Sequence, residues 1–141
     1  METFSYAVQL TADPDGGFVV TSRDLPEVVT QGDTWAQAIA EAEGALQAAI
    51  EMRIQDGLPI PPASSPQAGE AWAAVPIATA MKAALYLAMR EQGLGRTDLA
   101  RCLGVDDDEA QRILSAIDQG QIPALETALH CLGKRPELHV A

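Results

Sequence analysis

The chain has 141 residues, of which 48% are apolar but only 4% are aromatic, and its formal net charge is −11. This length suits one ordinary domain or two small ones, with cores built mainly from Ala, Leu, Ile and Val. Residues 1–66 carry ten acids against Arg23 and Arg53, whereas residues 67–141 carry ten acids against seven bases. The first half is therefore expected to repel nucleic acid and to attract basic surfaces.

The N-terminal segment "METFSYAVQL" lacks the basic region and long apolar core of a signal peptide. No run of 18 apolar residues reaches the length of a membrane span. A cytoplasmic protein is expected, with no membrane partner. Cys102 and Cys131 fall within helical patterns and are interpreted as reduced core residues, as is usual in a cytosol.

Residues 3–31 are predicted to form three short strands separated by turns. "TFSYAVQLT" alternates apolar and polar residues, "FVVT" follows the turn "ADPDGG", and "VVTQ" follows the turn "SRDLPE". Thr34 is a suitable N-cap for an amphipathic helix that begins at Trp35 and ends at Gly57. The strand residues predicted to face the core are Phe4, Tyr6, Val8, Leu10, Val19 and Val29.

Four prolines in "LPIPPASSPQAG" indicate a boundary between domains. We expect a first domain over residues 1–62, a linker that can add a short edge strand over 63–78, and a helical domain over 79–141. Thr79 and Thr97 are suitable caps for the first two helices of that domain. The next two are expected in "DDEAQRILSAI" and "PALETALHCLG", and "ELHVA" is interpreted as a short final strand.

Residues 96–114, "RTDLARCLGVDDDEAQRIL", have the pattern of two helices that meet at a glycine. The stretch resembles the DNA-reading helix-turn-helix of the Xre/Cro type, whose second helix enters the major groove. The predicted shared core is Leu99, Ala100, Leu103, Val105, Ala110, Ile113 and Leu114. The residues predicted to contact DNA are Arg96, Thr97, Arg101, Gln111 and Arg112.

The acids at residues 106–109 oppose this interpretation, because they would repel phosphates from the start of the second helix. Acids there also complement the helix dipole, so the pair can instead serve only as a dimerisation module. In either case we expect a homo-oligomer, a dimer or a tetramer, since DNA binding by one subunit would be weak.

Residues 6–64 resemble the HicB family of bacterial type II antitoxins. The resemblance rests on an aromatic-led first strand followed in order by "DPDGGFVV", "DLP", "TQGDT" with an Ala-rich helix, and "DGLPIPPAS". It implies an α+β protein: an N-terminal partial RNase-H-like sheet of three to four strands with one helix, then the all-α helix-turn-helix domain. Glu27 and Val28 depart from the glycine and small residue that often follow "DLP" in the family.

The resemblance also implies a function. Such a protein binds and neutralises a small basic HicA-type toxin that cleaves mRNA, and it represses its own operon by binding operator DNA. The acidic first half suits a basic partner. The residues predicted to contact the toxin are Asp13, Asp15, Asp24, Leu25, Pro26 and Glu27, although aspartates in turns also have purely structural roles.

An enzymatic function is not expected. Metal-dependent nucleases need carboxylates that converge on Mg²⁺ from neighbouring strands, and the predicted strands have no inward-facing acid. No cofactor and no metal are expected, because Cys102, His130, Cys131 and His139 lack the spacing of a zinc site. The alternative function is a stand-alone transcription regulator with an N-terminal oligomerisation or ligand-sensing domain.

Overall fold

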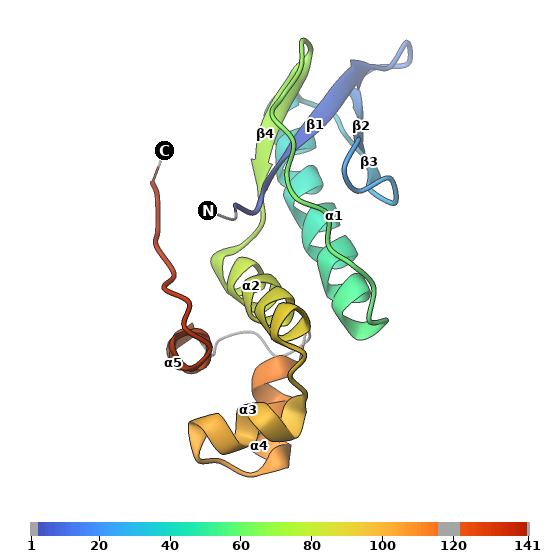
Figure 1. Ribbon diagram of the computed structural model, residues 1–141. Coiled ribbons are helices and arrows are strands. Elements are labelled where there is room, and N and C mark those ends of the chain that lie inside the picture. Colours follow the sequence, from blue (N-terminus) through green and yellow to red (C-terminus); the bar gives the residue numbers. More distant parts are fainter. Residues whose placement is uncertain (1–2, 116–121, 141) are drawn as a thin grey trace. The chain divides into compact units, whose positions relative to one another are not determined.

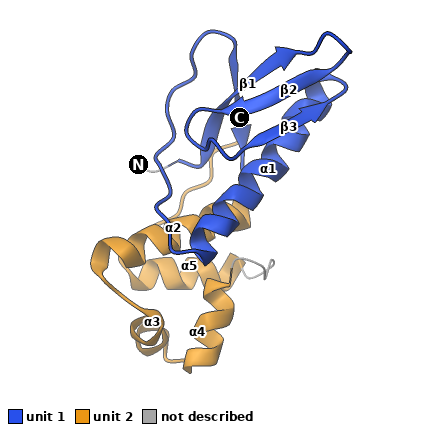
Figure 2. Ribbon diagram, turned by 90° about the vertical axis from the view of Figure 1, so that its right-hand side faces the viewer, with its two compact units in different colours: residues 1–76 blue, residues 77–141 orange. Residues whose placement is uncertain are grey.

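The computed structural model describes residues 3–115 and 122–140. Its elements run from four strands and one long helix to four shorter helices (Figure 1). The chain divides into two compact units, residues 1–76 and 77–141 (Figure 2). The α+β class expected from the sequence is confirmed. None of the helices in the described ranges is long and apolar enough to cross a membrane.

Unit 1 contains an antiparallel sheet with the strand order β3-β2-β1-β4. Its strands are β1 (Ser5–Ala12), β2 (Phe18–Ser22), β3 (Val29–Gly32) and β4 (Glu70–Ala74). The fourth strand comes from the segment expected to supply an edge strand, and it pairs with β1 from Ser5 opposite Ala74 to Gln9 opposite Glu70. The single helix of the unit, α1 (Trp35–Gln55), packs against all four strands.

The core of unit 1 lies between the sheet and α1. Tyr6 and Val8 are fully buried, as predicted, and so is Val20. The prediction was wrong for Val19 and Val29. Leu10 pairs with Val20, so Val20 shares the buried face, whereas Val29 pairs with exposed Thr21 and is itself 67% exposed. The residues of α1 that complete this core are Ala38, Ala42, Leu46, Ala49 and Ile50.

The predicted cap of α1 is confirmed. Thr34 has an extended backbone, and its hydroxyl oxygen accepts a hydrogen bond from the backbone N–H of Gln37 at 3.1 Å. This bond satisfies one of the four backbone donors that a helix start leaves without a partner. The helix ends at Gln55, and Gly57 follows with a φ of +68°, a conformation that favours glycine.

Unit 2 is built from α2 (Ile77–Gln92), α3 (Arg96–Leu103), α4 (Asp107–Leu114) and α5 (Ile122–Cys131). Its buried cluster draws on all four helices and includes Leu85, Leu99, Ile113, Leu125 and Leu129.

Several boundaries in unit 2 differ from the prediction. Helix α2 begins two residues before Thr79, which is buried and does not act as the cap. Helix α3 has Gly95 at its N-cap position, so the other predicted cap, Thr97, lies inside the helix. Residues 137–140 form no strand. The expected helical residues 116–117 and the final Ala141 lie outside the described residues.

Candidate functional site

The β2–β3 turn contains four of the residues predicted to contact a toxin, and the structure gives three of them, Asp24, Leu25 and Glu27, other roles. The Asp24 carboxylate accepts hydrogen bonds from the Ser64 backbone N–H at 2.8 Å and the Ser64 hydroxyl at 2.7 Å. Leu25 is fully buried, so its side chain contributes to the core and offers no surface for a partner. Pro26 is exposed.

Glu27 is also occupied within unit 1. Its carboxylate accepts two hydrogen bonds from the Arg53 guanidinium, at 2.6 and 2.9 Å. This bond lowers the pKa of Glu27, and the same contact raises the pKa of Arg53. A paired carboxylate of this kind anchors the turn to the end of α1.

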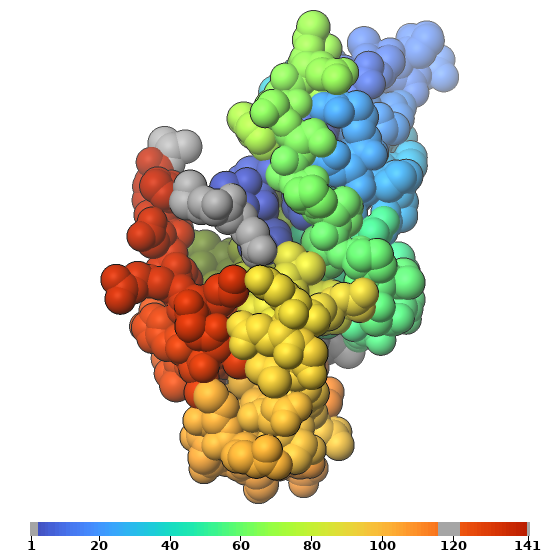
Figure 3. All heavy atoms as spheres, in the orientation of Figure 1, coloured from blue at the N-terminus to red at the C-terminus, as the bar shows by residue number. Residues whose placement is uncertain are grey.

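The other arginine of unit 1, Arg23, holds the proline-rich segment in place. Arg23 donates two hydrogen bonds to Glu70, at 2.7 and 2.8 Å, and one to the Ser65 carbonyl at 3.1 Å. These bonds, together with one from the Gln67 backbone N–H, lower the pKa of Glu70 to about 2. In the space-filling view, the green atoms of this segment lie against the light-blue β2–β3 region (Figure 3).

Unit 1 therefore carries a strong excess of negative charge. Residues 1–76 contain eleven acids and only two bases, and both arginines are held by acids of the same unit. Long-range attraction to a basic partner depends on this net charge and on the acids that remain at the surface. The exposed ones within the described residues include Asp15, Asp33, Glu41 and Asp56.

The β1–β2 hairpin carries the two remaining acids of the predicted site. The Asp13 carboxylate accepts a hydrogen bond from the Asp15 backbone N–H at 2.8 Å, which shapes the turn and leaves Asp15 exposed. This hairpin lies beside the β3–α1 connection. A Cβ atom at Gly17 would fall 2.6 Å from the Gly32 carbonyl oxygen and 3.3 Å from the Cα of Asp33.

An aromatic pair marks the junction between these two turns. Phe18 and Trp35 meet edge to face with their ring centroids 5.6 Å apart, and Trp35 is 48% exposed. Trp35 is the first residue of α1 and directly follows the β3–α1 connection, and the sequence patterns assigned it no contact with a partner.

In unit 2, α3 and α4 form a helix pair whose turn contains Gly104 with a φ of +70°. Leu99, Ala100, Ala110 and Ile113 are buried as predicted, whereas Val105 is 37% exposed and does not close the corner. Leu103 and Leu114 are partly buried. The residues predicted to contact DNA are all exposed: Arg96, Thr97, Arg101, Gln111 and Arg112.

Three of these residues, Arg96, Thr97 and Gln111, take part in hydrogen bonds between the two helices. The Thr97 hydroxyl donates to the Asp107 carboxylate at 3.0 Å, and Arg96 donates to Gln111 at 3.4 Å. The other two arginines each pair with an acid three residues earlier, at 3.8 Å for Arg101 and 2.6 Å for Arg112. Exposed pairs of this kind contribute about 0–1 kcal/mol, so they can open for a partner at little cost.

The acids at the start of α4 have local structural roles. The Asp106 carboxylate caps the helix by accepting from the Glu109 backbone N–H at 2.8 Å. Asp107 holds Thr97, and Glu109 pairs with Arg112. Asp108 is exposed. Three of the four acids thus have hydrogen-bonding or charged partners within the helix pair.

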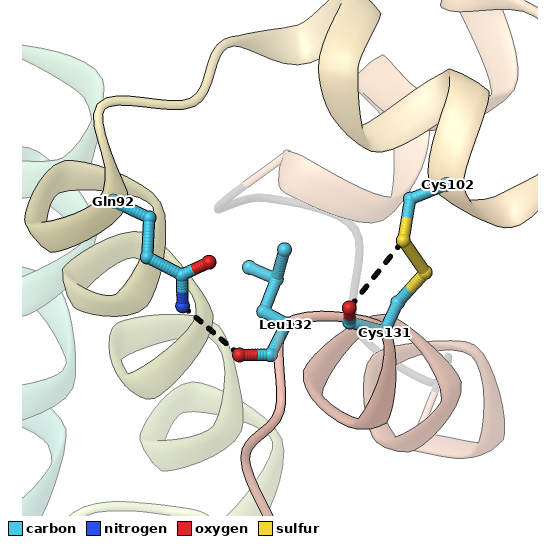
Figure 4. Close-up of a disulfide and its surroundings, with 4 residues drawn as sticks. All are labelled: Gln92, Cys102, Cys131 and Leu132. Atoms are coloured by element: carbon cyan, nitrogen blue, oxygen red, sulfur yellow. Dashed lines mark hydrogen bonds between the residues drawn. A yellow bond between two sulfur atoms is a disulfide. The ribbon is translucent and has the colours of Figure 1, made fainter.

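The two cysteines correct a prediction. Cys102 at the end of α3 and Cys131 at the end of α5 form a disulfide, with their Cα atoms 6.2 Å apart (Figure 4). They were expected to be reduced core residues. Packing of α3 on α5 brings together positions that are 29 residues apart, and a single sequence does not reveal that proximity. Among residues 3–115 and 122–140, no cluster of His, Cys, Asp or Glu is arranged to hold a metal ion.

Comparison with known proteins shows the family to which the chain belongs. The family model for the HicB-like antitoxin of bacterial toxin–antitoxin systems matches residues 5–84, which is more than half of the chain. The chain is 33% identical to Antitoxin HicB of Escherichia coli (strain K12), over 94% of this chain and 96% of the relative. It is 37% identical to Antitoxin HicB 2 of Photorhabdus laumondii, over 94% of each chain. The chain therefore belongs to the HicB-like family of antitoxins of bacterial toxin–antitoxin systems.

Proposed function

We propose that the protein neutralises a small, basic, mRNA-cleaving toxin of the HicA type through unit 1, and that it represses its own operon through the helix pair of unit 2. It acts in the cytoplasm as a binding protein, not as an enzyme. The proposal that unit 1 binds the toxin rests on the excess of acids over bases in this unit, where Arg23 and Arg53 both form internal ion pairs. An RNA-handling partner with a basic surface is attracted to such a unit.

The proposed contact surface is the edge formed by the β1–β2 hairpin and the β3–α1 connection. It differs from the one expected from sequence, because Asp24, Leu25 and Glu27 are engaged inside the unit. Exposed Trp35 supplies the kind of aromatic anchor that dominates interface energetics, and neighbouring acids supply attraction. The proposed contact residues are Asp13, Asp15, Phe18, Asp33 and Trp35. Pro26 is exposed but lies in the β2–β3 turn at the other end of β2, so it is not part of this surface.

Charge reversal at two places along unit 1 tests this surface. The variant D13K/D15K changes the charge at the hairpin, and its matched control E51K/D56K makes the same change near the C-terminal end of α1. Asp56 follows the C-terminal end of this 21-residue helix, about 30 Å from Trp35 at its start. We expect D13K/D15K to slow association with the co-expressed toxin and to weaken its salt dependence more than the control does. Equal effects of the two variants would mean that the surface lies elsewhere.

Replacement of the aromatic anchor gives an independent measurement. We expect W35A to weaken toxin binding by roughly tenfold or more, because a buried aromatic hot spot contributes about 2 kcal/mol. The control is W72A, since Trp72 on β4 is exposed to a similar degree, at 50%, but lies on the edge strand away from the hairpin turn. Unchanged affinity in W35A contradicts the proposed anchor.

The DNA-binding half is tested separately. We expect Q111A/R112A to lose retardation of operator DNA in a gel while it still neutralises the toxin. The control R90A removes a similar charge from α2, outside the helix pair. Specific DNA binding by a chain that engages no toxin would instead favour the stand-alone transcription regulator. Loss of both activities in Q111A/R112A would assign the pair a structural or dimerisation role.

A further inference from the structure

We propose that Cys102 and Cys131 form a reversible thiol–disulfide switch that sets how firmly α3 and α4 are held to the rest of unit 2. The bond joins the last turn of α3 to the last residue of α5, across 29 positions of sequence. The Cα separation of 6.2 Å lies within the range that a disulfide spans. Such a switch is a property of the chain alone and does not depend on the proposed partners.

The bond lies where small thiols can reach it. Cys102 is exposed and Cys131 is half-buried, whereas the apolar contact between the same helices, at Leu99 and Leu129, is fully excluded from solvent. Accessible disulfides exchange readily with thiols, and such bonds are the labile, regulatory ones in proteins. The position therefore suits regulation better than permanent reinforcement.

Reduction is expected to loosen the helix pair and to leave α5 in place. The end of α5 has its own anchor, because the Gln92 side chain donates to the Leu132 carbonyl at 2.9 Å (Figure 4). Leu125 and Leu129 of the same helix are also buried. By contrast, α3 has eight residues, of which only Leu99 and Ala100 are buried. The disulfide therefore adds a covalent link to the few buried contacts that hold α3 against α5.

In the reduced state, a hydrogen-bond acceptor lies within reach of the Cys102 thiol. The Cys102 sulfur lies 3.4 Å from the carbonyl oxygen of Cys131, a distance at which a thiol can donate a weak hydrogen bond. After reduction this contact can replace the covalent bond without a large movement of either helix. Both redox states are therefore compatible with the same helix arrangement, which is what reversibility requires.

A low-molecular-weight disulfide can supply the oxidant that forms the bond between Cys102 and Cys131. The thiolate of one cysteine attacks a sulfur of oxidised glutathione, which releases one glutathione thiolate and leaves a mixed disulfide. The second cysteine then attacks the protein sulfur of the mixed disulfide and releases the other glutathione. The two protein thiols are oxidised, and one glutathione disulfide is reduced to two thiols.

The test equilibrates the full chain with mixtures of reduced and oxidised glutathione, followed by acid quenching, alkylation and mass measurement. We expect both protein forms to be populated across these mixtures. A bond that never forms in excess oxidised glutathione would overturn the switch. So would a bond that persists in excess reduced glutathione, or one that forms only between two chains.

Thermal unfolding supplies the second readout. We expect the oxidised chain to lose its helical signal at a temperature on the order of 10 °C higher than the reduced chain, because the bond closes a loop that includes all of α4. The matched control is C102S/C131S, which should melt like the reduced chain and ignore added reductant. Equal melting of oxidised and reduced protein would overturn the proposal.

Discussion

Asp24 and Ser64 are 40 residues apart in the chain and are joined by two hydrogen bonds, one to the backbone N–H and one to the hydroxyl of the serine. Hydrogen bonds to a charged group are the stronger kind. This contact fixes the proline-rich segment on the β2–β3 turn, so the segment is part of unit 1 and not a free linker. It also gives the Asp24 carboxylate a structural role at a position that the sequence alone assigned to a partner surface.

The first prediction follows from this pair. We expect D24A to lower the free energy of unfolding of unit 1 by about 2–3 kcal/mol, because both Ser64 donors lose a charged acceptor. Urea unfolding measures the change. The control D15A removes an exposed carboxylate and is expected to stay within about 0.5 kcal/mol of the wild type. Equal stability of D24A and D15A would contradict the structural role of Asp24.

A second prediction concerns acid. The Arg23 contact lowers the pKa of Glu70 from its ordinary value of 4.5 to about 2, so the folded state favours the ionised form. This contribution to stability is complete above pH 4.5 and is lost as the pH falls toward 2. We expect E70Q to be less stable at neutral pH and to lose less stability over that interval. Urea midpoints measured against pH test this, and E41Q should retain the wild-type slope.

A third prediction concerns alkali. Burial raises the pKa of Tyr6 from 10.0 to about 12, with a further increase from nearby Asp24, while Arg53 acts in the opposite direction. The folded state thus holds the phenolic proton more tightly, so stability is complete below pH 10 and falls as the pH rises toward 12. The Tyr6 hydroxyl donates to the Pro61 carbonyl at 3.1 Å.

The variant Y6F removes this proton and this hydrogen bond. We expect it to be about 1 kcal/mol less stable at neutral pH, since a neutral hydrogen bond contributes about that much. Between pH 10 and 12 its stability should decline less than that of the wild type. Unfolding followed by circular dichroism measures both effects. If Y6F and the control Y86F show the same alkaline decline, Tyr6 is not its source.

A fourth prediction uses two glycines of unit 1. A Cβ at Gly32 would lie 2.4 Å from the backbone nitrogen of Ala38 and 2.6 Å from its Cα, so G32A forces α1 away from β3. We expect this variant to unfold unit 1 or to lower its stability by several kcal/mol, about the upper range for single substitutions. A Cβ at Gly44, within α1, would meet no atom of another element within 4 Å, so G44A should stabilise the helix by up to about 1 kcal/mol. Thermal unfolding compares the two, and similar melting temperatures would contradict the close packing at Gly32.

Local signals in the sequence predicted most of the fold. Thr34 before an apolar periodic segment located the start of α1, and alternation located β1. The phase of β2 was misjudged, because "FVV" is apolar at three successive positions and only its pairing with β1 selects Val20 for the core. The start of α2 was misplaced because Thr79 has the composition of a cap but is buried by tertiary packing.

The surface residues were harder to predict because acids look alike in a sequence. Asp15 stays exposed, whereas Asp24 and Glu27 are taken up by Ser64 and Arg53, and these partners lie 40 and 26 residues away. Such long-range pairing depends on the path of the whole segment around the sheet. The proximity of Cys102 and Cys131 could not be predicted either, because it depends on the packing of α3 against α5.

The register of β4 determines where unit 1 can be cut. Ala73 stands opposite Tyr6 and Trp72 opposite Ala7, so a fragment that stops among the prolines would expose the backbone donors and acceptors along one side of β1. An unpaired strand edge of that kind invites aggregation. The shortest well-behaved fragment of unit 1 should therefore extend to Pro76, and truncations made at residue 62 would report on a damaged sheet and not on recognition.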